Sequence, residues 1–273
     1  MLSITTHEDV VCVKVTLKPN GPASVVHVYL TDGMLVDTGP QIAEAELTAF
    51  YPTVSFDSVV LTHSHEDHVG TAAWISSHLH VPLYIHPKGI PLCTAPAEYP
   101  KYRQDAWGVR EAFSALPLGE TFSSRSSRWK VLETPGHAED HIALLDEETG
   151  RLFAGDLFLG PKTAVILRSE SIPQQIASLR AVLACPFQSV YCGHAGYLAQ
   201  GRERLSEKLA YLEHVSGEIL RLHQMGCQPV EINHRLFERV HPLTVISEGE
   251  FDSLHIVRSV VESMEGTGGY LPS

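Results

Sequence analysis

The 273-residue sequence predicts an α/β fold that is followed by a helical C-terminal extension. Segments with strand and helix patterns alternate up to residue 199, and the segments after it are helical. Several of the predicted strands end directly before His or Asp residues that neighbour a Gly, on loops that a rigid sheet would hold. We therefore expect a catalytic domain over residues 1–199 and a helical extension over residues 200–273.

The N-terminal segments have the pattern of strands. The β-branched residues of Val10–Leu17 alternate with other residues, and Ser24–Leu30 has a similar composition. The sequence PNGP at 19–22 predicts a turn between these two strands. A short strand over Met34–Val36 then leads to a helix over Gln41–Phe50.

The middle of the chain continues the alternation of strands and helices. Further strands are expected at Ser58–Leu61, Leu83–Ile85, Trp129–Thr134, Ile142–Leu145, Leu152–Ala154 and Ser189–Tyr191. Small and apolar residues at helical spacing predict a helix over Val69–Leu79. Ser171 and Gln174 resemble a capping box that starts a helix ending near Ala184. Residues 87–118 have no clear pattern.

The C-terminal part is predicted to be helical. One face of a long helix that ends at Gly226 is lined by Leu205, Leu209, Leu212, Ile219 and Leu222. Two further helices are expected over Pro229–Phe237 and about Phe251–Ser263. The sequence contains no internal repeat.

The composition indicates a globular and acidic protein. Apolar residues make up 44% of the chain, which is enough for a full hydrophobic core. Lys and Arg total 20 and Asp and Glu total 32, so the net charge is −12. An acidic chain repels phosphate backbones at long range, and this disfavours a nucleic-acid substrate. A metal site would add local positive charge, so nucleic acid stays open as an alternative.

Cysteine usage and the absence of targeting patterns indicate a cytoplasmic protein. The five cysteines form no C-x-x-C pair and are odd in number, as expected for reduced thiols. The first residues do not have the pattern of a signal peptide, and no apolar run is long enough to span a membrane. We expect no membrane partner, and a homo-oligomer remains open.

The central motif is H-x-H-x-D-H at residues 63–68, placed between a predicted strand and a predicted helix. Imidazole nitrogen and carboxylate oxygen are ligands of zinc. His63 and His65 can serve one ion, while Asp67 and His68 can serve a second. The alternative is a polar loop whose histidines are merely exposed.

Three further candidates weigh against that alternative, because they lie in separate segments and each has a Gly beside it. They are His137 in T-P-G-H, Asp156 in A-G-D and His194 in C-G-H. A neighbouring Gly permits the tight turn that brings such a side chain toward a common site.

With these segments in this order, the sequence resembles the metallo-β-lactamase superfamily over about residues 10–199. The resemblance implies a four-layer α/β/β/α sandwich with two metals in a cleft at one edge of the sheets. It implies that three histidines hold the first metal: His63, His65 and His137. It implies that three residues hold the second metal: Asp67, His68 and His194. Asp156 would bridge the two ions.

The identity of the candidate ligands indicates which branch of the superfamily the sequence resembles. Zinc β-lactamases of the commonest class have Cys where Asp156 stands, and related diiron flavoproteins have Glu where His65 stands. The sequence therefore predicts two Zn²⁺ ions per chain, with iron or manganese as alternatives. The segments around His137 and Asp156 are most similar to the glyoxalase II and lactamase-beta-two-like branch. Lys162 stands where glyoxalase II-like enzymes bind substrate, although an exposed loop lysine is the favoured interpretation.

The expected function is a zinc-dependent hydrolase that uses a metal-bridging hydroxide on a small ester, thioester or lactone. Zinc lowers the pKa of bound water to about 7, so hydroxide forms at neutral pH. Asp67 would orient this hydroxide, and the expected catalytic residues are Asp67 and His194. The alternative is a metal-dependent endoribonuclease that cuts single-stranded RNA, because both reactions can use the same metals. A binding scaffold without catalysis is disfavoured by the complete ligand set.

A few other residues have two interpretations. Asp37, in V-D-T-G, is expected to support the metal loop, with a simple turn former as the alternative. His141 is expected to be structural rather than a ligand. Tyr99, Tyr102 and Trp107 either line a lid over the substrate or belong to the core.

Overall fold

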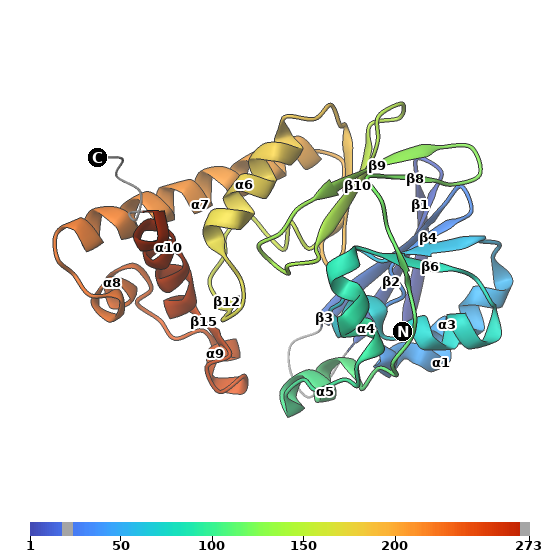
Figure 1. Ribbon diagram of the computed structural model, residues 1–273, viewed down its shortest axis with the longest axis horizontal. Helices are drawn as coiled ribbons and strands as arrows, with labels where there is room; N and C mark the ends of the chain where they lie inside the picture. Colours follow the sequence, from blue (N-terminus) through green and yellow to red (C-terminus); the bar gives the residue numbers. More distant parts are fainter. Residues whose placement is uncertain (18–23, 268–273) are drawn as a thin grey trace.

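Two β-sheets lie face to face in the computed structural model, which describes residues 1–17 and 24–267, and the C-terminal helices extend to one side of them (Figure 1). In sheet order, the first sheet consists of β1 (Leu2–His7), β2 (Val10–Leu17), β3 (Ser24–Thr31), β4 (Met34–Val36), β5 (Ser58–Val60), β6 (Leu83–Ile85) and β7 (Leu116–Pro117). The second sheet consists of β14 (Gly196–Leu198), β13 (Ser189–Cys192), β11 (Arg151–Gly155), β10 (Ile142–Asp146), β9 (Arg128–Glu133) and β8 (Thr121–Ser123). The turn expected at 19–22 lies outside the described residues.

Helices connect and cover the sheets. Those of the first half are η1 (Gln41–Ala43), α1 (Glu44–Phe50), η2 (Tyr51–Thr53), α2 (Glu66–Val69), α3 (Ala72–His78), η3 (Pro87–Gly89), α4 (Ile90–Thr94) and α5 (Lys101–Trp107). Those of the second half are α6 (Ile172–Leu183), α7 (Gly201–Gln224), α8 (Pro229–Leu236), α9 (Pro242–Ile246) and α10 (Ser253–Thr267). A separate two-stranded sheet pairs β12 (Ile166–Leu167) with β15 (Phe251–Asp252).

The alternation of side chains along each strand explains the layers. In β10, Ile142 and Leu144 join the core between the two sheets, whereas Ala143 and Leu145 join the core beneath the C-terminal helices. Successive side chains of a strand point to opposite faces, so a strand in which every residue is buried needs a layer on each side. A third core packs the outer face of the first sheet against α1 and α3. The predicted four-layer α/β/β/α sandwich is confirmed.

The helix predicted over Val69–Leu79 is divided into α2 and α3 by Gly70 and Thr71. Gly70 lies against the neighbouring backbone, and a Cβ at this position would be 2.2 Å from the amide nitrogen of Gln41. The Thr71 hydroxyl donates a hydrogen bond to the carbonyl of Thr38 at 2.7 Å. These contacts interrupt the helix and fasten it to the segment that follows β4.

The start of α2 also differs from the prediction. The helix begins at Glu66, three residues before the predicted start. Asp67 and His68 therefore lie in the first turn of a helix, while His63 and His65 lie on the loop before it. The change from loop to helix points the side chains of His63 and His65 toward one group of candidate ligands and those of Asp67 and His68 toward another.

Six of the described strands escape the sequence patterns. Four of them, β1, β7, β8 and β14, lie at sheet edges, and the other two, β12 and β15, pair with each other. Phe251–Asp252, which forms β15, was expected to begin a helix. β14 and β15 have only three and two residues, which is too short for a periodic pattern to appear. Their pairing is decided by tertiary contacts rather than by local propensity.

The C-terminal helices pack against the second sheet, as Figure 1 illustrates for α6 and α7. The predicted apolar face of α7 is buried at Leu205, Leu212, Ile219 and Leu222, in one core with residues of β10, β11 and β13. The division at residues 199 and 200 stays a prediction. Within residues 1–17 and 24–267, none of the helices combines the length and apolarity that a membrane crossing requires.

Candidate metal centre

The seven candidate ligands gather at one edge of the sandwich, although they come from four segments of the chain. Their potential ligand atoms form two groups, and within each group these atoms lie within 4.8 Å of one another. The first, called here the three-histidine cluster, contains His63, His65 and His137. The second, called the mixed cluster, contains Asp67, His68, Asp156 and His194.

The three-histidine cluster brings ring nitrogens together. Nε2 of His137 lies 3.0 Å from Nδ1 of His65. His63 is fully buried, and its Nδ1 lies 3.0 Å from the hydroxyl of Thr62. The Thr62 hydroxyl donates to a carboxylate, so it can accept the proton of His63 Nδ1 and leave Nε2 with a free lone pair. A neutral imidazole in this tautomer can bind a metal.

The mixed cluster combines imidazole and carboxylate. Nε2 of His194 lies 3.2 Å from Oδ2 of Asp67 and 3.1 Å from Oδ2 of Asp156. Nε2 of His68 lies 3.3 Å from the other oxygen of Asp156. His194 donates its Nδ1 proton to the carbonyl of Val25 at 2.6 Å, and this contact directs Nε2 toward the acids.

Asp156 lies between the two clusters. Its Oδ2 is 3.1 Å from Nε2 of His194 in one cluster and 3.5 Å from Nε2 of His137 in the other. Its backbone N–H donates to Nε2 of His141 at 2.9 Å, so His141 supports the turn and has the structural position expected from the sequence. Gly155 has a φ of +48°, and a Cβ there would be 2.6 Å from that His141 nitrogen. The turn that presents Asp156 therefore requires a glycine.

Asp37 supports both halves of the motif, by direct contact with His68 and through Thr62 with His63. Its Oδ2 accepts the Nδ1 proton of His68 at 2.8 Å and the hydroxyl proton of Thr62 at 2.9 Å. Its Oδ1 accepts the backbone N–H of Thr62 at 2.8 Å. Thr62 in turn contacts His63, so one carboxylate orients an imidazole in each cluster. This is the supporting geometry that the sequence suggested.

Glu170 was missed by the sequence reasoning. Its buried carboxylate accepts the Nδ1 proton of His137 at 3.2 Å, the Nε2 proton of Gln175 at 2.8 Å and the backbone N–H of Leu167 at 2.9 Å. Glu170 follows the short strand β12 and belongs to no motif. Only the tertiary fold places it behind His137.

The protonation preferences of the histidines differ between the clusters. Burial, together with the neighbouring histidines, lowers the pKa values of His63 and His65. Burial also opposes protonation of His68 and His194, but the charge of Asp156 and of nearby carboxylates outweighs it and raises their pKa values. Burial likewise opposes protonation of His137, but Glu170 and Asp156 outweigh it and raise its pKa. The mixed cluster therefore attracts positive charge, while two of the three histidines in the other cluster, His63 and His65, offer neutral nitrogens.

Several candidate ligand atoms lack a hydrogen bond. Nε2 of His63, Nε2 of His68 and Oδ1 of Asp156 are buried and have no hydrogen bond to the described residues, although the last two lie 3.3 Å from each other. Buried polar atoms of this kind are rarely left unsatisfied. Nitrogen and carboxylate donors that converge without partners fit metal ions.

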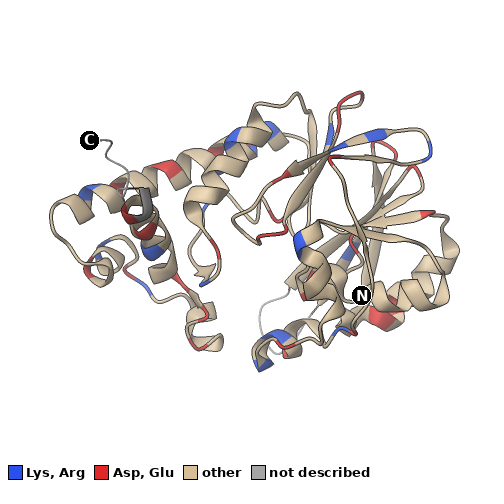
Figure 2. Ribbon diagram, viewed as in Figure 1, with Lys and Arg blue, Asp and Glu red and all other residues tan. Residues whose placement is uncertain are grey.

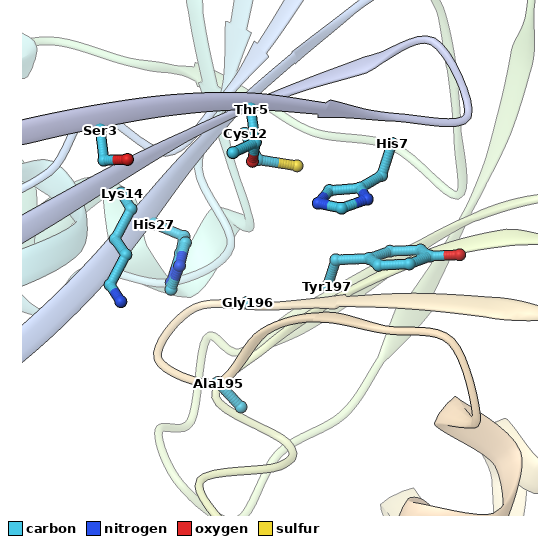
Figure 3. Close-up of a pocket in the computed structure, with 9 residues that line it drawn as sticks. All are labelled: Ser3, Thr5, His7, Cys12, Lys14, His27, Ala195, Gly196 and Tyr197. Atoms are coloured by element: carbon cyan, nitrogen blue, oxygen red, sulfur yellow. The ribbon is translucent and has the colours of Figure 1, made fainter.

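A small pocket lined by residues of β1, β2, β3 and β14 borders the loop that carries His194 (Figure 3). His27, at its inner wall, donates its backbone N–H to the carbonyl of Gly193 at 2.7 Å, and its ring Nδ1 lies 3.4 Å from the same oxygen. Gly196 has a φ of +76°, and a Cβ there would be 2.9 Å from the His27 ring. Contacts with β3 thus fix the shape of the loop that carries His194.

Two of the three aromatic residues with open interpretations have clear positions. The ring of Trp107, at the end of α5, has its centre 6.2 Å from that of His194, so it borders the site. The Tyr99 hydroxyl instead donates to the carbonyl of Gly108 at 2.7 Å and accepts the N–H of Arg110 at 2.9 Å, which is a structural role. Lys162 is exposed, in agreement with the favoured interpretation.

A family profile described as the metallo-beta-lactamase superfamily matches residues 20–210, which is most of the chain. The chain belongs to the metallo-beta-lactamase superfamily. Within this superfamily, the probable metallo-hydrolase YqjP of Bacillus subtilis (strain 168) is 26% identical, and the match covers 97% of this chain and 98% of that protein.

Two other relatives match over a smaller share of their length. A beta-lactamase-like protein 2 homolog of Caenorhabditis elegans is 28% identical over 66% of this chain and 57% of its own. Thioesterase pkgB of Emericella nidulans is 31% identical over 71% of this chain and 52% of its own. The chain thus spans only about half the length of these two relatives.

Solved structures agree with the fold. A metallo-beta-lactamase family protein from Thermus thermophilus has a TM-score of 0.66 at 21% identity, covering 95% of this chain and 94% of that one. The protein TTHA1623, in a di-iron-bound form, has a TM-score of 0.55 at 28% identity, covering 70% of this chain and 96% of that one. The chain is a metallo-hydrolase whose His and Asp groups fit a two-metal site.

Proposed function

We propose that this metallo-hydrolase binds two zinc ions and hydrolyses a small ester, thioester or lactone. The position of Asp156 between the clusters, within 3.5 Å of an imidazole nitrogen in each, is the observation that carries the proposal. One zinc would bind at the three-histidine cluster and one at the mixed cluster, with Asp156 shared. Five of the seven proposed ligands are imidazoles, which suit zinc, and we keep iron, which imidazole also binds, as the alternative.

The protein's own groups would position the reactants. Bound metal ions would supply Lewis-acid activation of water and of the carbonyl under attack. Burial opposes ionisation of Asp67, but His68 and His194 overcome it and lower its pKa, so its carboxylate stays ionised and can orient the water by accepting a hydrogen bond. The hydrogen bond to Val25 keeps Nε2 of His194 directed toward that carboxylate.

Acyl substrates are favoured over RNA by the charges of the C-terminal helices. Figure 2 shows acidic and basic residues interspersed over these helices. Lys208 is buried, and Arg202 donates to the carbonyls of Leu183 and Cys185 inside the fold. A single-strand-binding surface would need a basic face with aromatic stacking positions. The relative named as a thioesterase adds support for acyl chemistry.

The test is a hydrolysis panel with purified, zinc-loaded protein at physiological salt. We expect turnover of at least one small ester, acyl thioester or lactone, with weak and salt-sensitive cleavage of single-stranded RNA. His65→Ala should abolish the activity, whereas His234→Ala, an exposed histidine on α8, should leave it unchanged. Strong RNA cleavage that depends on His65, together with no acyl hydrolysis, would favour the endoribonuclease instead.

A further inference from the structure

Helix α5 links the metal centre to the C-terminal extension. Its last residue, Trp107, borders His194, as described above. Its first turns face the segment between α9 and α10, where the rings of Tyr102 and Phe251 meet edge to face with their centres 6.4 Å apart. Arg103 lies between these two contacts and is only 15% exposed.

Arg103 holds a buried carboxylate of the metal motif. Its Nε and Nη2 donate to the two oxygens of Glu66 at 2.6 Å and 2.7 Å, in the forked geometry that arginine forms with carboxylates. Glu66 is 4% exposed and directly precedes Asp67 in the first turn of α2. Removal of Arg103 would leave a buried acid beside a ligand carboxylate without its cation.

The same guanidinium reaches the C-terminal segment. Its Nη1 lies 3.5 Å from a carboxylate oxygen of Glu250. The carbonyl of Glu250 accepts the N–H of Arg168 at 3.2 Å, and the next residues form β15, which pairs with β12. β12 leads into Glu170, the partner of His137. The C-terminal segment therefore contacts both sides of the metal centre.

We propose that Arg103 is a positioning residue that couples the C-terminal segment Glu250–Phe251 to the metal-binding loop, so that this segment forms part of the active site. The inference rests on the proposed metal-binding roles. The contact of Arg103 with Glu66 would affect the metal, because Glu66 directly precedes Asp67. The contact of Arg103 with Glu250 would hold α5, and with it Trp107, beside the metal centre.

Loss of the Arg103–Glu66 contact and loss of the Arg103–Glu250 contact should have different effects on metal affinity and on kinetics. Arg103→Gln leaves Glu66 unpaired, so we expect metal affinity of the mixed cluster to fall about tenfold, with a lower kcat. Arg103→Lys keeps the charge but loses the fork, so its effect should be smaller. Glu250→Gln leaves the Glu66 contact in place, so metal affinity should stay unchanged while KM rises about fivefold, because α5 is held less firmly.

Hydrogen exchange of the backbone amides of α5 gives a readout without substrate or metal. The amides of Arg103, Gln104 and Gly108 donate within and beside this helix, so their exchange reports its opening. Exchange should accelerate in Glu250→Gln and in Arg103→Gln. Lys101→Gln is the control, because it breaks only an exposed ion pair with Asp105 on the same helix. It should accelerate exchange by no more than about twofold and leave KM and metal affinity unchanged.

Equal behaviour of Glu250→Gln and Lys101→Gln in α5 exchange and in KM would overturn the proposal. Unchanged metal affinity in Arg103→Gln would overturn it as well. If Arg103→Gln does not fold, Arg103→Lys and Glu250→Gln provide the same comparison. If the protein hydrolyses no acyl substrate, exchange and metal affinity still measure the coupling, so a failure of the proposed function is distinguishable from a failure of this inference.

Discussion

The two clusters of the metal centre lie side by side but differ in charge. The three-histidine cluster contains only imidazoles, and its supports, Thr62 and Glu170, lie behind the rings. The mixed cluster contains two carboxylates, with a third, that of Asp37, directly behind His68. One cluster therefore offers only imidazole nitrogens, while the other adds the negative charge of carboxylates, which a cation would offset.

This difference would give the two proposed ions different chemistry. At the three-histidine cluster a metal would displace a proton only from His137, where burial opposes protonation but Glu170 and Asp156 raise the pKa, because burial chiefly lowers the pKa values of His63 and His65. Binding at the mixed cluster must displace protons from His68 and His194. Asp156 belongs to this second cluster but also lies beside His137, so it links the two equilibria.

Asp156→Asn should have the largest effect, because it removes the charge that the two clusters share. We expect loss of at least one metal ion and at least about 100-fold lower activity, at the upper end of effects seen when metal-site partners are removed. Metal content and steady-state kinetics measure both outcomes. Asp9→Asn is the control, since that side chain is 96% exposed. Near-normal turnover with a full metal complement would mean that Asp156 does not bridge.

Two isosteric substitutions compare the supports of the clusters. Asp37→Asn should weaken metal binding about 10- to 100-fold, because it loosens His68 and, through Thr62, His63. Asn also tolerates the φ of +60° at this position. Glu170→Gln should have a smaller effect that is confined to the three-histidine cluster, because Glu170 contacts only His137 among the proposed ligands in the described residues.

Chelator competition with each purified variant would measure these affinities. If Glu170→Gln weakened binding at both clusters as much as Asp37→Asn does, Glu170 would not act on the three-histidine cluster alone.

The sequence identified the His and Asp residues that cluster in the structure better than it identified the residues that support them. The ligands sit in local motifs, and Asp37 was also recognisable because it ends a strand in V-D-T-G. Glu170 and Arg103 have no such pattern, since they reach the site only through the pairing of β12 with β15 and the placement of α5. Similarly, the break at Gly70 depends on the backbone that packs against it, not on helix propensity.

Metal retention at low pH should differ between the two clusters, and this is the smallest of the expected effects. Burial opposes protonation of His68 and His194, but the surrounding carboxylates raise their pKa values above the usual value of about 6.5, so protons compete with metal as the pH falls. The lowered pKa values of His63 and His65 keep these ligands neutral over the same range.

We therefore expect the mixed cluster to lose its metal first on acidification, and the three-histidine cluster to keep its metal to lower pH. Metal content after dialysis over a pH series, with Asp37→Asn as a comparison, would measure the two steps. Release of both ions in one step, or loss from the three-histidine cluster first, would show that the charge difference does not govern binding.

The most direct test of two metal sites with a shared carboxylate is anomalous diffraction from crystals of protein purified without added metal. The account predicts two peaks at the zinc edge, one between His63, His65 and His137 and one at the mixed cluster, with Asp156 contacting both. A single peak, peaks away from these residues, or a signal at the iron edge instead would contradict it.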